Sequence, residues 1–123
     1  MAYNSIANAG ELLQAACHRA SRDAGWWDGV DITDKNIVPV KLCLIHSEIS
    51  EAMEGHRKNL PDDHLPHRKM LEVELADAVI RIADLAGALG LDLGGAIADK
   101  MAYNASRADH KPEARAATNG KAY

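Results

Sequence analysis

Four carboxylates occur as two pairs of similar spacing, in two segments that each have the pattern of a helix. Glu48 and Glu51 form one pair, and Glu74 and Asp77 form the other. Residues three apart in a helix project from one face and are separated by roughly 4.5 Å along its axis. Each pair therefore places two carboxylates beside the apolar stripe of its helix. If the two helices are neighbours, all four carboxylates meet at one point.

Converging carboxylates repel one another, and their charges are costly near a core unless protons or a cation compensate them. Mg²⁺ prefers oxygen ligands and keeps several waters that a phosphate can replace, and Mn²⁺ accepts the same ligands. The alternative is a solvated helix edge, because one such pair on a helix is common. The second pair on the next helix favours the cation site, whereas Glu54 and Glu72 lie outside the pairs and are assigned to the surface.

A polar stripe in a later helical segment complements the carboxylates. Lys100, Asn104 and Arg107 are spaced i, i+4 and i+7. Lysine provides a point charge, arginine a bidentate fork for phosphate, and asparagine a neutral donor and acceptor. Interhelical salt bridges are the alternative use of such a stripe. Together the two patterns predict a site for a metal ion and a phosphate.

The elements that must position these residues are four amphipathic helices, and no segment has a convincing strand pattern. Asn36 and Asp92 are plausible N-caps, and Pro112 is expected to stop any helix. We predict an all-α four-helix bundle over residues 1–110, followed by a tail at 111–123 that is mobile or packed over the site. Part of the apolar surface is expected to be buried in an oligomer. The helices are expected near residues 5–23, 36–59, 66–89 and 92–107.

Composition excludes several classes of protein. The net charge of −4 argues against a nucleic-acid binder, which needs a basic face. No run approaches the ~20 apolar residues of a membrane span, and no signal peptide is recognisable. We therefore expect a cytoplasmic protein without nucleic-acid or membrane partners. Cys17 and Cys43 occupy apolar helical positions and are interpreted as small buried hydrophobic residues rather than a disulfide.

These motifs together resemble the all-α nucleoside triphosphate pyrophosphohydrolases, the superfamily of MazG, dimeric dUTPases and phosphoribosyl-ATP pyrophosphatase. The resemblance covers roughly residues 36–110, and it is closest to small single-domain MazG-like proteins. The first helix fits the family more loosely. The segments that carry the resemblance are the Glu48-x-x-Glu51 and Glu74-x-x-Asp77 pairs, EISEAMEGHRK, EVELADAVIRIADLAGALGLDL and KMAYNASRADH, the last being similar to a K-x-x-x-N-x-x-R element.

The resemblance implies cleavage of a nucleoside triphosphate between the α and β phosphates, which gives a monophosphate and pyrophosphate. It also implies a homodimer or homotetramer. Bound metal ions would stabilise the attacking and leaving oxygens, and a glutamate would accept the proton of the attacking water. For that role we favour Glu51 over Glu48. The implied Mg²⁺ ligands, for which Mn²⁺ can substitute, are Glu48, Glu51, Glu74 and Asp77, and the implied substrate residues are Lys100, Asn104 and Arg107.

Two further residues are weaker substrate candidates. Trp26 and Trp27 stand together in a loop, where one can stack on a base; we assign this role to Trp27, the alternative being a loop anchor or a subunit contact. Arg81 either pairs with Asp77 or Asp84 or assists the site. We expect deoxynucleoside triphosphates as substrates, with purines (dATP, dGTP) preferred. The alternatives are dUTP, dUDP or an alarmone, or a non-catalytic helical oligomerisation module.

Overall fold

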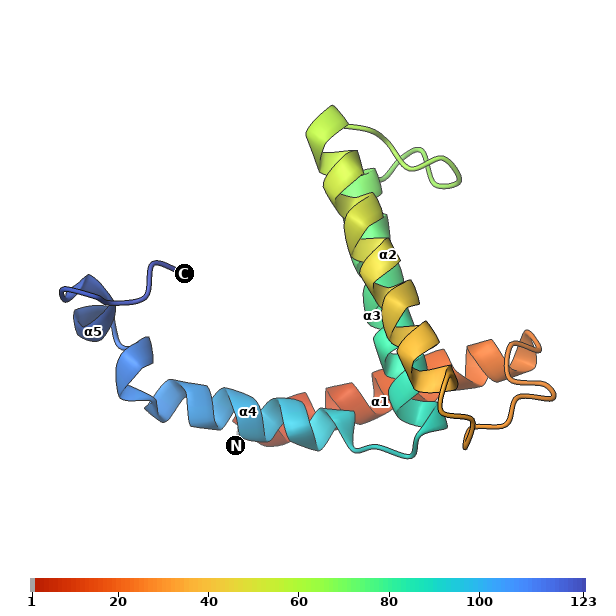
Figure 1. Ribbon diagram of the computed structural model, residues 1–123, viewed down its shortest axis with the longest axis horizontal. Coiled ribbons are helices and arrows are strands. Elements are labelled where there is room, and N and C mark those ends of the chain that lie inside the picture. The colour runs from red at the N-terminus through yellow and green to blue at the C-terminus, as the bar shows by residue number, and fades with distance from the viewer. Residues whose placement is uncertain (1) are drawn as a thin grey trace. The chain divides into compact units, whose positions relative to one another are not determined.

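The computed structural model describes residues 2–123 and is all-α (Figure 1). Within these residues the only β-pairing is an isolated bridge between Pro61 and Lys69, and no helix is long and apolar enough to cross a membrane. The all-α class and the four main helices are therefore confirmed. The elements are α1 (Ala2–Asp23), α2 (Ile37–Lys58), α3 (Met70–Ala88), α4 (Leu93–Ser106), the 3₁₀ helix η1 (Ala108–His110) and α5 (Pro112–Ala116).

The start of α3 differs from the prediction. The helix begins at Met70 rather than near residue 66. The preceding residues instead form a tight loop around Asp62, whose Oδ2 accepts hydrogen bonds from the backbone N–H groups of His64 and Leu65. Aspartate side chains often satisfy the backbone in this way, and such bonds compete with helix formation. Pro66 therefore lies in this loop and does not begin the helix.

The capping predictions had mixed outcomes. Asp92 caps α4 as expected, because its Oδ1 accepts a hydrogen bond from the Gly95 N–H at 2.9 Å. Asn36 does precede α2, but its side chain makes no capping hydrogen bond. Pro112 begins the short helix α5 instead of stopping a helix. Proline suits that position because the first N–H groups of a helix have no intrahelical partner.

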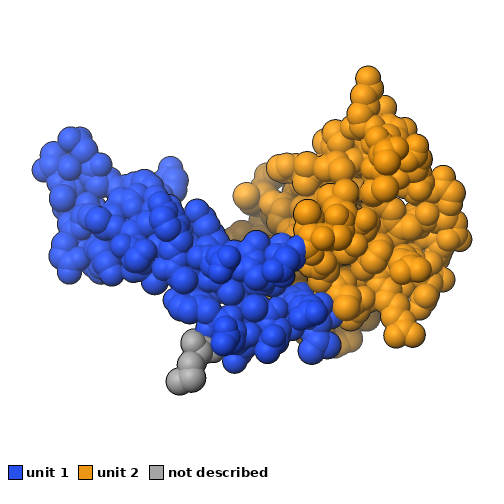
Figure 2. All heavy atoms as spheres, turned by 90° about the horizontal axis from the view of Figure 1, so that it is seen from below, with its two compact units in different colours: residues 1–12, 92–123 blue, residues 13–91 orange. Residues whose placement is uncertain are grey.

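The chain divides into two compact units (Figure 2). Unit 2 comprises residues 13–91, and unit 1 comprises residues 2–12 and 92–123. In unit 1 the tail folds back locally, since Lys121 Nζ donates a hydrogen bond to Asp109 Oδ2 at 2.8 Å. The division into a domain at 1–110 and a tail at 111–123 stays a prediction.

In unit 1, α4 crosses the first half of α1 at a pair of glycines. A Cβ atom on Gly94 would lie 2.3 Å from the Ala7 carbonyl oxygen, and one on Gly10 would lie 2.5 Å from the Cα of Gly94. No side chain fits at such separations, so the missing Cβ atoms are what allow the two backbones to approach.

In unit 2, α2 and α3 pack side by side and run antiparallel (Figure 1). Gly55, near the end of α2, lies against Met70 at the start of α3, while Glu48, further back in α2, contacts Arg81 further along α3. A Cβ on Gly55 would lie 2.8 Å from Met70 Cβ, so this glycine permits the close approach at that end.

The faces that α2 and α3 bury differ from the predicted apolar stripes. The buried residues of α2 are Glu48, Ala52 and Gly55. Apolar spacing predicts stripes that include Ile49 and Ala52 on α2 and Ala78 and Val79 on α3. Ala52 and Ala78 are buried as predicted, whereas Ile49 and Val79 are 48% and 46% exposed. The stripes are thus correct for the alanines and wrong for these larger residues, because small residues let the helices approach while larger side chains lie at the flanks. Leu42, Leu75 and Ile82 are exposed in the same way.

The cysteine prediction is half correct. Both thiols are free, as expected, and Cys17 is buried in α1. Cys43 is exposed on α2, which contradicts its assignment as a buried residue. Cys43 lies on the side of α2 opposite the buried residues Glu48, Ala52 and Gly55, so its apolar side chain alone did not place it in the core.

Candidate metal centre

Three of the four predicted carboxylates come together where α2 packs against α3 in unit 2. One oxygen from each of Glu48, Glu74 and Asp77 lies within 4.8 Å of the other two. Glu48 and Glu74 are buried, and Asp77 is half-buried. Three oxygen donors at this separation form a set that can hold a hard divalent cation. We call these three residues the carboxylate cluster.

The fourth predicted ligand, Glu51, lies at the edge of this cluster. It is exposed on α2 and does not belong to the group of three. Its carboxylate is still close enough to Glu74 to influence the ionisation of that residue. The roles of all four residues as metal ligands stay predictions, with Glu51 in the more accessible position.

Burial and mutual repulsion make two members of the cluster hard to ionise. Burial, a hydrogen bond with Glu48 and the negative charge of Glu51 raise the pKa of Glu74 to about 7. Burial and the charge of Glu48 also raise the pKa of Asp77, while the positive charge of Arg81 opposes that shift. The cluster therefore favours the binding of a proton or a cation.

Arg81 is a positively charged residue that contacts the cluster through Glu48. Its Nε donates a hydrogen bond to Glu48 Oε1 at 2.6 Å, which joins α3 to α2. We had expected Arg81 to pair with Asp77 or Asp84 on its own helix, and Glu48 takes their place. Spacing along one helix cannot reveal a partner on the neighbouring helix, so only the packing of α2 against α3 identifies it.

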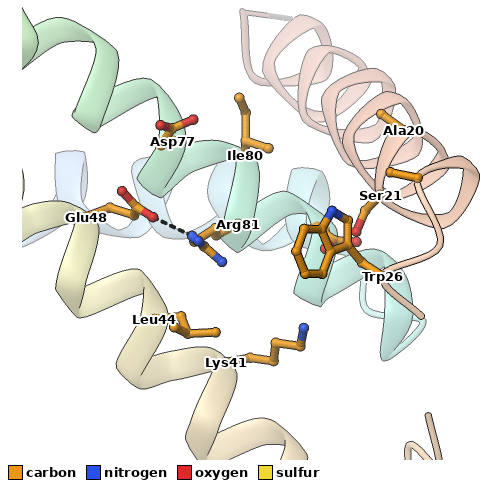
Figure 3. A pocket seen from close by; sticks show the side chains of 11 residues that line it. Ala20, Ser21, Trp26, Lys41, Leu44, Glu48, Asp77, Ile80 and Arg81 are labelled. Atoms are coloured by element: carbon orange, nitrogen blue, oxygen red, sulfur yellow. Dashed lines mark hydrogen bonds and ion pairs between the residues drawn. The ribbon is translucent and has the colours of Figure 1, made fainter. Parts of the chain in front are cut away.

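A cavity of about 550 Å³ adjoins the cluster within unit 2 (Figure 3). Glu48 and Asp77 belong both to the cluster and to the cavity wall. In Figure 3 the Arg81 side chain points toward Glu48, and Lys41 and Trp26 lie on the other side of it. The remaining lining residues are Ala20, Ser21, Ala24, Leu44, Ile80 and Asp84.

Asp84 lines the same cavity, and two side-chain nitrogens lie within hydrogen-bond distance of its carboxylate. Trp27 Nε1 donates to its Oδ1 at 2.9 Å, and His18 Nδ1 lies 2.9 Å from the same oxygen. The Trp27 ring also meets the edge of His18 and has Lys41 Nζ 4.6 Å from its centroid. Trp27 thus anchors the α1–α2 loop on α3. Its assignment as a substrate residue stays a prediction.

Sequence reasoning missed Lys41, named Asp84 only as a partner of Arg81, and assigned the base-stacking role to Trp27 rather than to Trp26, which lines the cavity. One signal was available: Asp77, Arg81 and Asp84 are spaced i, i+4 and i+7 and form a polar stripe along α3. That stripe lies on the cavity wall. Lys41 and Trp26 come from other segments, and no periodic pattern connects them to α3.

Lys100, Asn104 and Arg107 belong to unit 1. Lys100 and Asn104 line a cavity of about 490 Å³, and the Asn104 Oδ1 atom is buried without a hydrogen-bond partner in the described structure. Arg107 does not line that cavity. It forms a bidentate ion pair with Asp109, at 2.9 Å from Nε and 2.6 Å from Nη2. Their joint use in a phosphate site stays a prediction.

Comparisons of the chain with protein-family models, with curated proteins and with solved structures found no match. The site therefore rests on its own geometry. That geometry is a buried Glu/Glu/Asp cluster that can bind a metal ion, next to a cavity that carries basic and aromatic side chains.

Proposed function

We propose that the chain is a Mg²⁺-dependent nucleoside triphosphate pyrophosphohydrolase, which cleaves its substrate between the α and β phosphates. The observation that carries the proposal is the carboxylate cluster beside the larger cavity. Burying three carboxylates against one another is unfavourable without a compensating cation. Carboxylates on a solvated helix edge would remain in water, so the burial of these carboxylates favours a functional site.

The residues supply a consistent chemistry. Glu48, Glu74 and Asp77 would hold Mg²⁺ or Mn²⁺, with Glu51 joining from the edge. When bound, the metal would offset phosphate charge and lower the pKa of a water. Glu51 is exposed beside the cluster, so it is the carboxylate best placed to accept the proton of the water that attacks the α phosphorus. Pyrophosphate is then the leaving group, and no covalent intermediate is required.

The substrate we propose is a deoxynucleoside triphosphate. A cavity of about 550 Å³ is within the usual range for small-molecule sites. Trp26 lines it and is 70% exposed, which leaves an aromatic face available for a base. The preference for purines rests on this aromatic side chain. The resemblance to the pyrophosphohydrolases implies that Lys100, Asn104 and Arg107 hold the triphosphate or the sugar.

We also propose that the chain acts as a homo-oligomer, a dimer or a tetramer. The supporting observation is the set of large aliphatic side chains left exposed on α2 and α3, which includes Ile49, Met53 and Val79. A second copy of the chain would remove these side chains from water at about 25 cal/mol per Å². Sedimentation of the purified protein tests this directly.

The test of the activity is pyrophosphate release from the eight common ribo- and deoxyribonucleoside triphosphates, with Mg²⁺ and with EDTA. Wild type, Glu51→Gln and Glu74→Gln are compared, with Glu54→Gln as the matched control. Glu54 lies on the same helix as Glu51 but pairs with Lys58 at the surface. We expect metal-dependent release of pyrophosphate and monophosphate, lost in the first two variants and kept in the control.

Other outcomes separate the alternatives. Release of orthophosphate would still indicate a metal-dependent hydrolase, but it would contradict cleavage between the α and β phosphates. If none of the eight is hydrolysed, dUTP, dUDP and an alarmone are tested next. Turnover of one of these would identify a different substrate class. A folded oligomer that turns over none of these and binds no Mn²⁺ would support the non-catalytic oligomerisation module.

A further inference from the structure

Arg81 stands between two surroundings that differ in charge. On one side its Nε–H is hydrogen-bonded to Glu48 Oε1 at 2.6 Å. On the other side it lines the cavity, and its side chain is 42% exposed, whereas the Glu48 side chain is only 10% exposed. The acid is therefore held inside the helix pair, while the guanidinium has open space into which it can turn (Figure 3).

The charges that line the cavity would repel an anion as they stand. The carboxylates of Glu48, Asp77 and Asp84 outnumber the basic groups of Lys41 and Arg81. Of these two bases, Arg81 is engaged by Glu48, and Lys41 lies over the Trp27 ring. A divalent cation at the carboxylate cluster would offset this excess of negative charge. Binding of an anion in the cavity should therefore depend on prior binding of the cation.

We propose that Arg81 is an exchangeable counter-ion: a divalent cation at the carboxylate cluster displaces it from Glu48, and it then binds a phosphate group in the cavity. The proposal rests on the metal site of the proposed function. It adds a positioning and anion-binding role for a residue that the carboxylate motif does not include.

Electrostatics favours exchange over a fixed pair. A guanidinium stays charged under all ordinary conditions, so it cannot reduce its repulsion from a nearby cation by losing a proton. Two cations on one carboxylate repel, and only the guanidinium has a flexible side chain and a cavity to enter. A phosphate can accept a bidentate pair of hydrogen bonds from the guanidinium, whereas the Glu48 carboxylate accepts only the one from Nε. The cation and the phosphate should thus bind with positive cooperativity.

The first experiment follows the Arg81 Nε–H group by NMR in the wild-type protein, with the resonance assigned by its loss in Arg81→Lys. Without Mg²⁺ we expect a resonance protected from solvent exchange by Glu48. Saturating Mg²⁺ should shift it and speed its exchange, and added inorganic phosphate should restore protection. An unchanged resonance at Mg²⁺ saturation would overturn the exchange.

The second experiment measures Mn²⁺ and phosphate affinities for Arg81→Gln, Arg81→Lys and wild type at pH 8, where Glu74 is ionised. In Arg81→Gln we expect Mn²⁺ alone to bind about tenfold tighter, since a neighbouring like charge is gone. Phosphate should bind the Mn²⁺-loaded variant about tenfold more weakly, since a charge-assisted hydrogen bond is lost. Arg81→Lys should keep a Mn²⁺ affinity near that of wild type.

Arg57→Gln is the matched control, because Arg57 pairs with Glu54 at the exposed surface of α2 and should change neither affinity. Weaker Mn²⁺ binding in Arg81→Gln with unchanged phosphate binding would overturn exchange, because it would identify Arg81 as a fixed partner that orients Glu48. Absence of saturable Mn²⁺ binding by folded wild type would instead overturn the proposed metal site itself. Arg81→Lys keeps a positive charge beside Glu48. It therefore serves as the test variant if Arg81→Gln does not fold.

Discussion

Asp77 and Asp84 are two aspartates of one helix that line one cavity, yet their surroundings are opposite. Asp84 Oδ1 is within 2.9 Å of two nitrogens, those of Trp27 and His18. Asp77 instead faces the carboxylates of Glu48 and Glu74, and the positive charge that acts on it belongs to Arg81, which is hydrogen-bonded to Glu48. Residue type and helix are the same, so the neighbours from other segments make the difference.

The difference separates an acid that is satisfied by hydrogen-bond donors from one that has a place for a cation. A buried carboxylate that accepts hydrogen bonds stabilises the elements that supply the donors. A buried carboxylate that faces other carboxylates destabilises the fold until a proton or cation arrives. Asp84 therefore holds α1 and its following loop on α3, whereas Asp77 belongs to a cluster that can bind a cation. The two residues should respond in opposite ways to the same substitution.

The largest expected effect compares Asp77→Asn with Asp84→Asn. Removing a carboxylate from the cluster should reduce Mg²⁺-dependent hydrolysis by more than about 100-fold, since even residues that only orient a ligand cost 10- to 100-fold. Asp84→Asn should change it by less than about tenfold. Steady-state rates of pyrophosphate release measure both. Equal losses would mean that Asp84 belongs to the reacting site.

The order reverses for stability. Asp84→Ala leaves His18 and Trp27 without their shared partner and should lower the free energy of unfolding by about 2 kcal/mol. Asp77→Ala, measured in EDTA, should leave the stability unchanged or raise it, because it relieves repulsion within the cluster. Urea unfolding followed by helix circular dichroism provides the values. A larger loss in Asp77→Ala would contradict our separation of the two acids.

The pH dependence of stability sharpens the comparison further. Glu74 has a pKa of about 7 in the folded protein, above its ordinary value of 4.5, so the folded state binds a proton that the unfolded state has lost. In EDTA the stability should therefore fall as the pH rises from about 5 through 7. Mg²⁺ should offset this fall at high pH. Melting temperatures test it, and the slope should decrease in Glu74→Gln but persist in Asp84→Asn.

The smallest effect concerns the adjacent tryptophans. Trp27→Phe removes the hydrogen bond to Asp84 Oδ1 and should cost about 1 kcal/mol of stability. Trp26→Phe is the matched control; it changes a side chain that is 70% exposed and should stay within about 0.5 kcal/mol. Equal destabilisation of the two variants would show that the hydrogen bond with Asp84 is not what anchors the loop.

Much of the local structure could be predicted because it depends on neighbours in the chain. Apolar periodicity placed the four helices, and Asp92 was recognised as a cap from its position before Leu93. The spacing of Glu74 and Asp77 likewise predicted that both lie on one side of a helix. The start of α3 was missed because the Asp62 side chain accepts hydrogen bonds from backbone N–H groups of the preceding loop. The Pro-rich sequence of that loop does not indicate these bonds.

The amino-acid sequence by itself determined the helices and the side-by-side placement of carboxylates within each of them, because both follow from the fixed period of the α-helix. Only the tertiary structure decided which face of each helix is buried. Ala52 and Ala78 are buried as the apolar spacing predicts, but Glu48 and Glu74 are buried with them while the larger Ile49 stays exposed. The partner of Arg81 and the donors around Asp84 were decided in the same way. Contacts between helices depend on the shapes of both surfaces, and periodicity along one helix contains no information about the other.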